Sequence, residues 1–346
     1  MPYPWANVFI LIVGGLSLLS GFLGLLGGSP SWGLALDVHR ISGFALVALL
    51  LWKGQNILRS LMNRRNWRRR PGIVIGSIAT LLLLLIALGL GIAWSFSGYF
   101  TFQGFSALSW HIYLSLLLGP FVVMHAYKHS WTLRTRFWIE RRSFLRLAGL
   151  GIAGLAVWRT GELAVAALSL PGKDRRFTGS YERGSFTGNA FPTTSWLNDD
   201  PDPVVKDAWR LNVSGLVSRD LDLRLADLTG NREKVTAVLD CTGGWHSTQE
   251  WQGVPLREVL VTAGVEPGAG SVTVRSVTGY QRRFSMAEAD QYLLATHVGG
   301  DPISHGHGAP LRLVAPGKRG YEWVKWVVAV RVNDTGKWWQ PPLPLS

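Results

Sequence analysis

Long, nearly uncharged runs of apolar residues dominate the first half of this 346-residue chain. One run covers Val8 to Leu26 and another covers Gly72 to Trp94. Each run has about the 20 residues that a helix needs to cross the hydrocarbon core of a bilayer. A bilayer offers the backbone no hydrogen-bond partners, so a spanning run must satisfy its own backbone groups. The first half is therefore expected to be a helical membrane domain.

We expect five spanning helices, followed by a soluble domain with ordinary globular composition from about Pro171. The predicted helices cover Val8–Leu26, Gly33–Leu58, Gly72–Phe96, Phe105–Tyr127 and Phe144–Leu168. The predicted organisation is a four-helix transmembrane domain at 1–130, a basic cytoplasmic loop with the fifth helix at 131–170, and an extracytoplasmic domain at 171–346.

The charge distribution predicts the orientation of the helices. The net charge of +13 would suit a nucleic-acid-binding protein, but much of it lies beside the apolar runs. Residues 59–70 hold six Arg residues and 128–142 hold five Lys or Arg residues, whereas the loops at 27–32 and 97–104 hold none. By the positive-inside rule the amino terminus is cytoplasmic, and the domain after the fifth helix lies on the extracytoplasmic, periplasmic side of the cell membrane. We expect membrane lipid as a partner, and no nucleic acid.

The start of the fifth apolar run carries a second export feature. Residues 140–146 read Glu-Arg-Arg-Ser-Phe-Leu-Arg, which resembles a twin-arginine motif. The twin-arginine route exports folded cargo, which suits a domain that takes up a large cofactor in the cytoplasm. The alternative is a plain basic flank on a spanning helix.

The second half alternates short β-type runs with turns. Strands are expected in segments such as those at 209–217, 234–241, 271–280, 309–316 and 326–332, with short helices at 255–264 and 285–293. This pattern predicts a mixed α+β domain.

Cys241 is the only cysteine in the chain, so an intrachain disulfide is excluded. It follows a β-type run and precedes Gly243 and Gly244, which allow the backbone to approach a ligand closely. A thiolate here could bind a soft metal, or the side chain could simply fill the core at a strand end.

The segment around Cys241 resembles the sulfite oxidase superfamily, whose cysteine binds molybdenum. The matching elements are Cys241, a turn at Gly244-Trp245 and a Trp-x-Gly-Val-Pro-Leu helix start at 251–256. Two further blocks match, His307-Gly-Ala-Pro-Leu-Arg312 with Val324-Lys-Trp326, and Asn189-Ala-Phe-Pro-Thr193. The last resembles the methionine-sulfoxide-reductase branch. The resemblance implies a molybdenum–molybdopterin cofactor in a sulfite-oxidase-like fold, here fused to a b-type-cytochrome-like membrane domain.

The resemblance also implies which residues hold the pterin and its phosphate. By matching position, these are Asn189, Thr193, Ser276, His307, Arg312, Trp323, Val324 and Lys325. Arg312 and Lys325 have the charge that a phosphate needs. Each could instead be an ordinary surface or edge residue, and neighbouring His305 competes with His307.

Four histidines lie in or beside the apolar runs, where ionisable residues are usually functional. His39 and His111 fall near the outer ends of two helices that run in the same direction, so they could ligate one haem b. His125 follows His111 by 14 residues, about 21 Å of helix, as in two-haem membrane cytochromes. The inner partner expected near position 53 is Lys53, so His125 and His129 are assigned to a quinone pocket or to the cytoplasmic interface. The alternative is that all four are polar residues of a plain anchor.

These features predict a membrane-anchored molybdenum oxidoreductase. Electrons would pass between quinol, a haem and the molybdenum centre, which acts on a small sulfoxide, N-oxide or sulfite-like substrate. His246 could supply a catalytic proton or be an exposed turn residue, and Arg282 and Arg283 could contact substrate. The alternatives are a redox-silent anchored binding protein and a haem-only electron carrier with a vestigial outer domain. The sequence does not fix the substrate or the direction of reaction.

Overall fold

The computed structural model of the protein describes residues 4–128, 141–195, 199–228 and 233–344. The chain forms two compact units, unit 1 with Met1–Leu25 and Pro30–Tyr181, and unit 2 with Leu26–Ser29 and Glu182–Ser346. The division follows Tyr181 rather than the expected Pro171, because residues 171–181 are bonded to the helices. The Arg175 guanidinium donates to the Ser95 carbonyl at 2.8 Å, and the Tyr181 hydroxyl donates to the Trp94 carbonyl at 2.5 Å.

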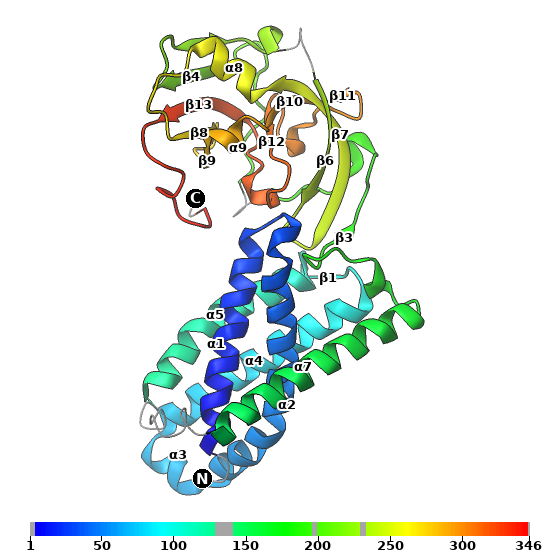
Figure 1. Cartoon of the computed structure of the whole chain (residues 1–346), viewed down its shortest axis with the longest axis vertical. Coiled ribbons are helices and arrows are strands. Elements are labelled where there is room, and N and C mark those ends of the chain that lie inside the picture. Colours follow the sequence, from blue (N-terminus) through cyan, green and yellow to red (C-terminus); the bar gives the residue numbers. More distant parts are fainter. Residues whose placement is uncertain (1–3, 129–140, 196–198, 229–232, 345–346) are drawn as a thin grey trace. The chain divides into compact units, whose positions relative to one another are not determined.

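The described residues of unit 1 form a bundle of long helices (Figure 1). They are α1 (Pro4–Leu26), α2 (Gly33–Met62), α4 (Pro71–Ser97), α5 (Ala107–Lys128) and α7 (Arg141–Ala167). A short helix α3 (Arg64–Arg69) and a ribbon of β1 (Thr101–Phe102) and β2 (Phe105–Ser106) connect them. All five long helices are apolar and long enough to span a membrane, which confirms the predicted set of apolar helices. Of the twin-arginine-like segment, Glu140 lies outside the described residues.

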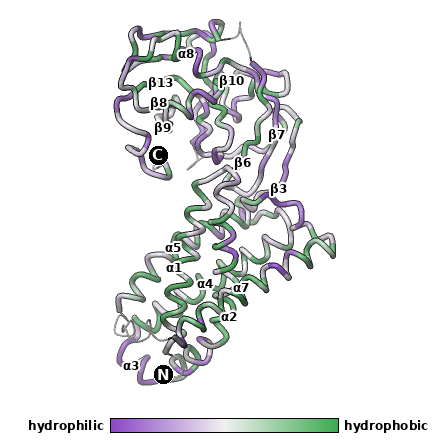
Figure 2. The backbone as a smooth tube through the Cα atoms, viewed as in Figure 1, coloured by the Kyte–Doolittle hydropathy of each residue, from purple (hydrophilic) through white to green (hydrophobic). Residues whose placement is uncertain are grey.

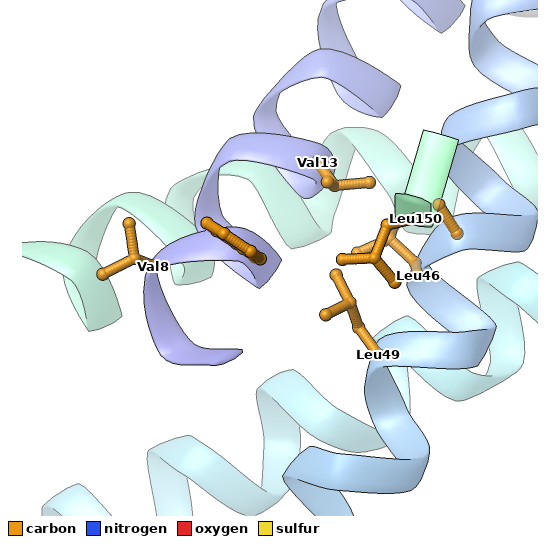
Figure 3. Packing of buried hydrophobic residues seen from close by; sticks show 7 residues of the cluster. Val8, Val13, Leu46, Leu49 and Leu150 are labelled. Atoms are coloured by element: carbon orange, nitrogen blue, oxygen red, sulfur yellow. The ribbon is translucent and has the colours of Figure 1, made fainter. Parts of the chain in front are cut away.

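Apolar side chains hold the bundle together on its inside and also cover its outside. Val8, Val13, Leu46, Leu49 and Leu150 meet where α1, α2 and α7 pack (Figure 3). Large apolar residues such as Leu51, Leu82 and Ile152 are exposed on the outer faces. Figure 2 shows hydrophobic colour along most of each long helix. Helices that are hydrophobic all round are typical of a bundle built for lipid.

Unit 2 is built from two sheets with two short helices, which confirms the predicted mixed α+β class. One sheet has the order β11-β10-β7-β3, with β6 on β7 and β12 on β10. The other has the order β5-β4-β13-β8-β9, in which β13 and β4 are parallel. The elements are β3 (Tyr181–Glu182), β4 (Leu211–Gly215), β5 (Leu221–Leu223), β6 (Glu233–Asp240), β7 (Trp245–Pro255), α8 (Leu256–Ala263), β8 (Ser271–Ser276), β9 (Gln281–Ser285), α9 (Met286–Ala289), β10 (Leu293–Val298), β11 (Asp301–Pro302), β12 (Arg312–Val314) and β13 (Val327–Asn333).

Strand β7 is the main departure from the predicted secondary structure. The sequence predicts no strand after the turn at Gly244-Trp245, whereas the structure forms one strand over Trp245–Pro255. Helix α8 begins at Leu256, within one residue of the start of the helix expected at 255–264. Side chains along β7 alternate between a buried and a half-buried face. The buried face includes the polar residues Ser247 and Gln249, so the period of two is invisible in hydropathy.

Candidate functional site

Cys241 lies in the tight turn that joins β6 to β7. Its backbone N–H donates to the Trp245 carbonyl at 2.9 Å, and the Gly244 N–H donates back to the Cys241 carbonyl at 3.1 Å. Gly244 adopts a φ of 88°, which a side chain would disfavour. The hairpin therefore fixes the cysteine at the end of β6, as the sequence predicts.

The sulfur of Cys241 is buried and has two hydrogen-bond donors nearby. The Gly243 amide donates to Sγ at 3.3 Å. The Thr194 hydroxyl is the second donor, and its own oxygen accepts from the Trp245 indole at 3.2 Å. Burial raises the pKa of the Cys241 thiol, while these two donors lower it. The donors stabilise a thiolate, so the site is suited to a thiolate bound to a metal cation.

A buried ion pair fixes the Cys241 turn from behind. The Arg319 guanidinium contacts the Asp240 carboxylate at 2.7 Å, and both side chains are almost fully buried. At the next residue, a Cβ on Gly320 would lie 3.2 Å from the Cys241 Cα, so the two segments approach closely. Removing one charge of such a pair typically costs about 3–5 kcal/mol. Sequence reasoning missed Arg319, because its partner lies 79 residues away.

Arg312 lies in an aromatic cage on β12 and is 2% exposed. Its guanidinium carbon lies 5.0 Å from the Trp251 ring centroid and 5.8 Å from that of Trp323. One guanidinium nitrogen donates to the His307 carbonyl at 2.8 Å. Among the described residues no carboxylate pairs with Arg312. A buried cation without a counter-charge favours an anionic ligand.

Phe191 connects the cysteine to the arginine cage. Its ring centroid lies 6.2 Å from Trp245, beside the cysteine turn, and 5.9 Å from Trp251, in the cage. It also contacts His307, with ring centroids 3.8 Å apart and ring planes tilted by 45°. These aromatic contacts bring Cys241 and Arg312, distant in sequence, into one continuous site.

His307 is buried and both of its ring nitrogens are used within the protein. Nε2 is 3.0 Å from the Phe191 carbonyl and Nδ1 is 2.8 Å from the Ser304 hydroxyl. A carbonyl can only accept, so Nε2 carries the proton and Nδ1 accepts. Burial, and then the charge of Arg312, lower the pKa of His307 to about 4. His307 is therefore neutral and positions Arg312 through its carbonyl. Its neighbour His305 bonds to the Pro201 carbonyl at 2.9 Å.

Lys325 lies near the same site, and its amine donates to the Gly306 carbonyl at 2.7 Å. Burial, and then the charge of Arg312, lower the pKa of Lys325 to about 8, against about 10.5 for an exposed lysine. The Thr193 side chain lies beside Gly306, where an added Cβ would be 3.1 Å from it. Thr193 and Lys325 are thus brought together, as the matched positions imply.

Three other predicted residues lie around this region. Ser276 is buried at the end of β8 and accepts from the Thr278 hydroxyl at 3.1 Å. The Asn189 side chain bonds to the backbone at Pro302 and Ser304, at 3.0 and 2.8 Å. The Val324 carbonyl accepts from the Leu313 amide at 2.8 Å. Asn189 and Val324 thus support the loops around the site.

The residues predicted to face substrate lie apart from the aromatic cage. His246 projects from the half-buried face of β7, opposite the buried face that carries Trp245 and Trp251. Arg282 is buried and pairs with Glu322 at 3.1 Å, and Arg283 donates to the Thr335 hydroxyl at 2.8 Å. Both arginines belong to β9 rather than to the expected turn, and their guanidinium groups are bonded within the protein.

Unmatched buried donors test whether this site fits a molybdopterin. Arg312 Nε and the indole nitrogens of Trp251 and Trp323 are buried and have no hydrogen-bond partner among the described residues. A polar, anionic group beside them would supply acceptors and counter-charge. With the thiolate of Cys241 as a soft ligand, the donor set fits a molybdenum–pterin group.

A second candidate centre lies in unit 1, where His39 on α2 meets His111 on α5. Their ring centroids are 5.8 Å apart. His39 Nδ1 is 2.8 Å from the Ser17 carbonyl, and His111 Nδ1 is 2.7 Å from the Ala87 carbonyl. Each Nδ1 therefore carries the proton, and neither Nε2 has a hydrogen-bond partner among the described residues. Two imidazoles with oriented rings and available Nε2 atoms fit axial ligands of one haem.

Glycines on the neighbouring helices make room for the two rings. A Cβ on Gly21 in α1 would lie 2.8 Å from the His39 ring, and one on Gly91 in α4 would lie 3.1 Å from the His111 ring. Sequence reasoning missed both glycines. Of the two inner histidines, His125 belongs to α5 and His129 lies outside the described residues.

Comparison with known proteins finds a matching family in unit 2. The profile described as oxidoreductase molybdopterin binding domain matches residues 199–338. The chain is similar to the uncharacterized oxidoreductase YuiH of Bacillus subtilis, with 30% identity over 178 residues that cover 48% of this chain and 88% of that protein.

Two further relatives match over similar stretches. The catalytic subunit MsrP of protein-methionine-sulfoxide reductase from Gluconobacter oxydans is 29% identical over 175 residues, 44% of this chain and 54% of that protein. The sulfite oxidase of Gallus gallus is 30% identical over 182 residues, which cover 41% of this chain and 39% of that protein. The chain spans about a fifth of the length of the plant nitrate reductases that it also matches.

Proposed function

The chain belongs to the oxidoreductase molybdopterin-binding family, in the sulfite oxidase superfamily, and from this premise we propose that it is a membrane-anchored molybdenum enzyme that exchanges electrons with the quinone pool. Cys241 is the proposed molybdenum ligand. The observation that carries the proposal is a buried thiol with two hydrogen-bond donors at one end of the site. At the other end lies buried Arg312, which no carboxylate of the described residues pairs with.

When bound, the molybdenum–pterin group supplies the redox chemistry, and this chain's residues supply position and charge. Arg312 and Lys325 would bind the anionic phosphate, and the indoles of Trp251 and Trp323 would donate to polar atoms of the ligand. His307 holds Arg312 in place through its carbonyl. The Arg319–Asp240 pair would hold the cysteine turn in place during the reaction.

Metal analysis of Cys241→Ala tests the proposed ligand. We expect about one molybdenum per wild-type chain, purified from cells that assemble the cofactor, and almost none in Cys241→Ala. Equal molybdenum in the two proteins would disprove the ligand. Wild-type protein that contains molybdenum but shows no turnover with any acceptor would instead favour the redox-silent binding protein.

The proposed electron route in unit 1 is a haem b bound by His39 and His111. When bound, such a haem carries single electrons between quinol and an acceptor. The proposal is supported by the oriented Nδ1 atoms and by the space that Gly21 and Gly91 leave for the rings. His125 and His129 are proposed to lie by the quinone. A reduced-minus-oxidised spectrum of b type should be lost in His39→Ala and in His111→Ala, and an unchanged spectrum would remove this route.

A small oxidised or oxidisable compound of sulfoxide, N-oxide or sulfite type is the proposed substrate. His246 remains a proposed proton donor. Turnover with reduced dye should be compared across these substrates in wild type and His246→Gln. A loss confined to kcat, with a changed pH profile, would support proton transfer, and an unchanged profile would exclude it.

Unit 2 is proposed to lie on the extracytoplasmic side, with export assisted by the twin-arginine-like segment at 140–146. Support comes from the basic loops and from the five apolar helices. External protease should cleave unit 2 in spheroplasts. In inverted membrane vesicles, unit 2 should stay intact until detergent is added. Protection in spheroplasts would contradict this orientation.

A further inference from the structure

Two adjacent tryptophans near the end of unit 2 are exposed, although their segment is firmly held. Trp338 is 84% exposed and Trp339 is 76% exposed. Large aromatic side chains are rarely left in water as a pair without a function, and such apolar patches mark contact sites. Neither residue belongs to the molybdopterin site or to the histidine pair.

The segment that carries the pair is anchored on both sides. Before it, the Lys337 amine contacts the Glu288 carboxylate at 2.7 Å, and Glu288 also holds Lys318 at 2.6 Å. After it, the Gln340 side chain exchanges two hydrogen bonds with the backbone of Arg283, at 2.6 and 2.9 Å. The turn is therefore fixed to α9 and β9, and its tryptophans are displayed by the fold.

The chemistry around the pair is that of a membrane interface. Tryptophan prefers the headgroup region, where its ring is partly buried and its indole N–H can still donate. The Lys337 amine lies 5.0 Å from the Trp338 ring centroid, so a cation accompanies the aromatic surface and suits lipid phosphate. Glu288 is paired with both Lys337 and Lys318. Glu322 lies 3.8 Å from Lys318 and is paired with Arg282, so the cations of this cluster outnumber its carboxylates.

Chain connectivity favours lipid over other occupants. Unit 2 begins at Glu182, directly after Tyr181, whose hydroxyl is bonded to Trp94 near the end of the apolar helix α4. A domain joined to a spanning bundle without a free linker stays close to the bilayer surface. We propose that Trp338 and Trp339 insert into the headgroup region of the bilayer and hold unit 2 against the membrane, an inference that rests on the proposed membrane anchoring.

Nitroxide labels on the full chain in lipid nanodiscs test this insertion. The chain has one other cysteine, the buried Cys241, so single labels can be placed at Trp338→Cys, Val261→Cys and Leu85→Cys. Val261 is 78% exposed on α8 and serves as the aqueous control, and Leu85 is 46% exposed in the middle of α4 and serves as the lipid control.

The depth parameter is positive where a label is more accessible to oxygen than to a water-soluble nickel complex. We expect a positive value for the labels at positions 338 and 85, and a negative value for the label at position 261. A negative value at 338 with a positive value at 85 would overturn the insertion while the anchoring stands. A negative value at 85 would overturn the anchoring itself. Protection of 338 from both reagents would overturn lipid contact in favour of a protein partner.

Discussion

At the scale of single residues, the hydrogen bond from Thr194 to the Cys241 sulfur should set the properties of the bound metal. A donor to a thiolate withdraws charge from it, and hydrogen bonds to ligand sulfur tune reduction potentials. We expect Thr194→Val to lower the molybdenum midpoint potential by on the order of tens of millivolts, with unchanged metal content. Potentiometric titration of the molybdenum electron paramagnetic resonance signal measures this shift.

Two variants control for a merely structural effect at this position. Thr194→Ser keeps the hydroxyl and should keep the wild-type potential. Trp245→Phe removes the indole donor behind Thr194 and keeps an aromatic ring beside Phe191, so its shift should be smaller and in the same direction. Equal potentials in Thr194→Val and Thr194→Ser would show that the hydroxyl does not tune the metal.

Lys325 should make anion binding by the cofactor-free protein depend on pH. Its pKa of about 8 means that the amine is charged below that pH and neutral above it. Because the folded pKa is lower than the unfolded value of about 10.5, the unfolded chain holds the proton more tightly between these values. This group alone therefore makes the folded protein more stable as pH rises through that window.

Anion affinity should change in the opposite direction. A charged hydrogen bond contributes about 1.5–3 kcal/mol, so loss of the Lys325 charge should weaken pyrophosphate binding about five- to tenfold between about pH 7 and 9. Isothermal titration calorimetry of cofactor-free protein measures this affinity. Lys325→Arg keeps its charge throughout and should flatten the profile. A profile as steep in Lys325→Arg as in wild type would point to another group.

The residues of the candidate molybdopterin site differ in how far the sequence could identify them. Cys241, Arg312 and Lys325 could be predicted, because each lies in a short segment with distinctive neighbours. Thr194 and Arg319 could not, because their roles arise from contacts with Cys241 and Asp240 that form only when distant segments fold together. The sequence also showed no sign that Arg282 is buried and paired with Glu322. Its predicted contact with substrate rested on its positive charge alone.

At the scale of elements, the helices were predictable and the strands less so. Five runs of apolar residues predict five helices, because a helix in lipid needs about 20 such residues whatever its neighbours are. Strand β7 was missed because its buried face carries Ser247 and Gln249, which bond to each other and to the Gly184 carbonyl. These tertiary hydrogen bonds allow polar side chains to be buried, so the alternation of apolar and polar residues that predicts a strand is absent.

Packing between α1 and α2 yields a prediction about the haem. An added Cβ on Gly21 would lie 2.8 Å from two atoms of the His39 ring, which the Ser17 carbonyl holds in place. We expect Gly21→Ala to displace the ring and to reduce the haem content at least about twofold, because a bound ring has little freedom to move. The haem-to-protein ratio from pyridine haemochrome spectra measures the loss.

The same helix offers a matched control for Gly21→Ala. Gly15 has no atom within 4 Å of an added Cβ, so Gly15→Ala makes the same chemical change without a clash. It should retain wild-type haem content and helicity. A loss of haem in Gly15→Ala equal to that in Gly21→Ala would mean that helix α1 responds to alanine in general, and not through His39.

At the scale of the whole molecule, we propose that the two units have separate tasks, which a single variant can distinguish. Quinol is expected to reach only unit 1, whereas a soluble reduced dye can deliver electrons directly to a metal site in unit 2. If the haem carries electrons from quinol to unit 2, His111→Ala should lower quinol-driven turnover about 100-fold or more. The same variant should keep dye-driven turnover within about twofold of wild type. Cys241→Ala should abolish both activities. Assays of the two variants with each donor in nanodiscs distinguish the routes. Quinol-driven turnover that survives in His111→Ala would exclude the haem route and leave unit 1 as an anchor alone.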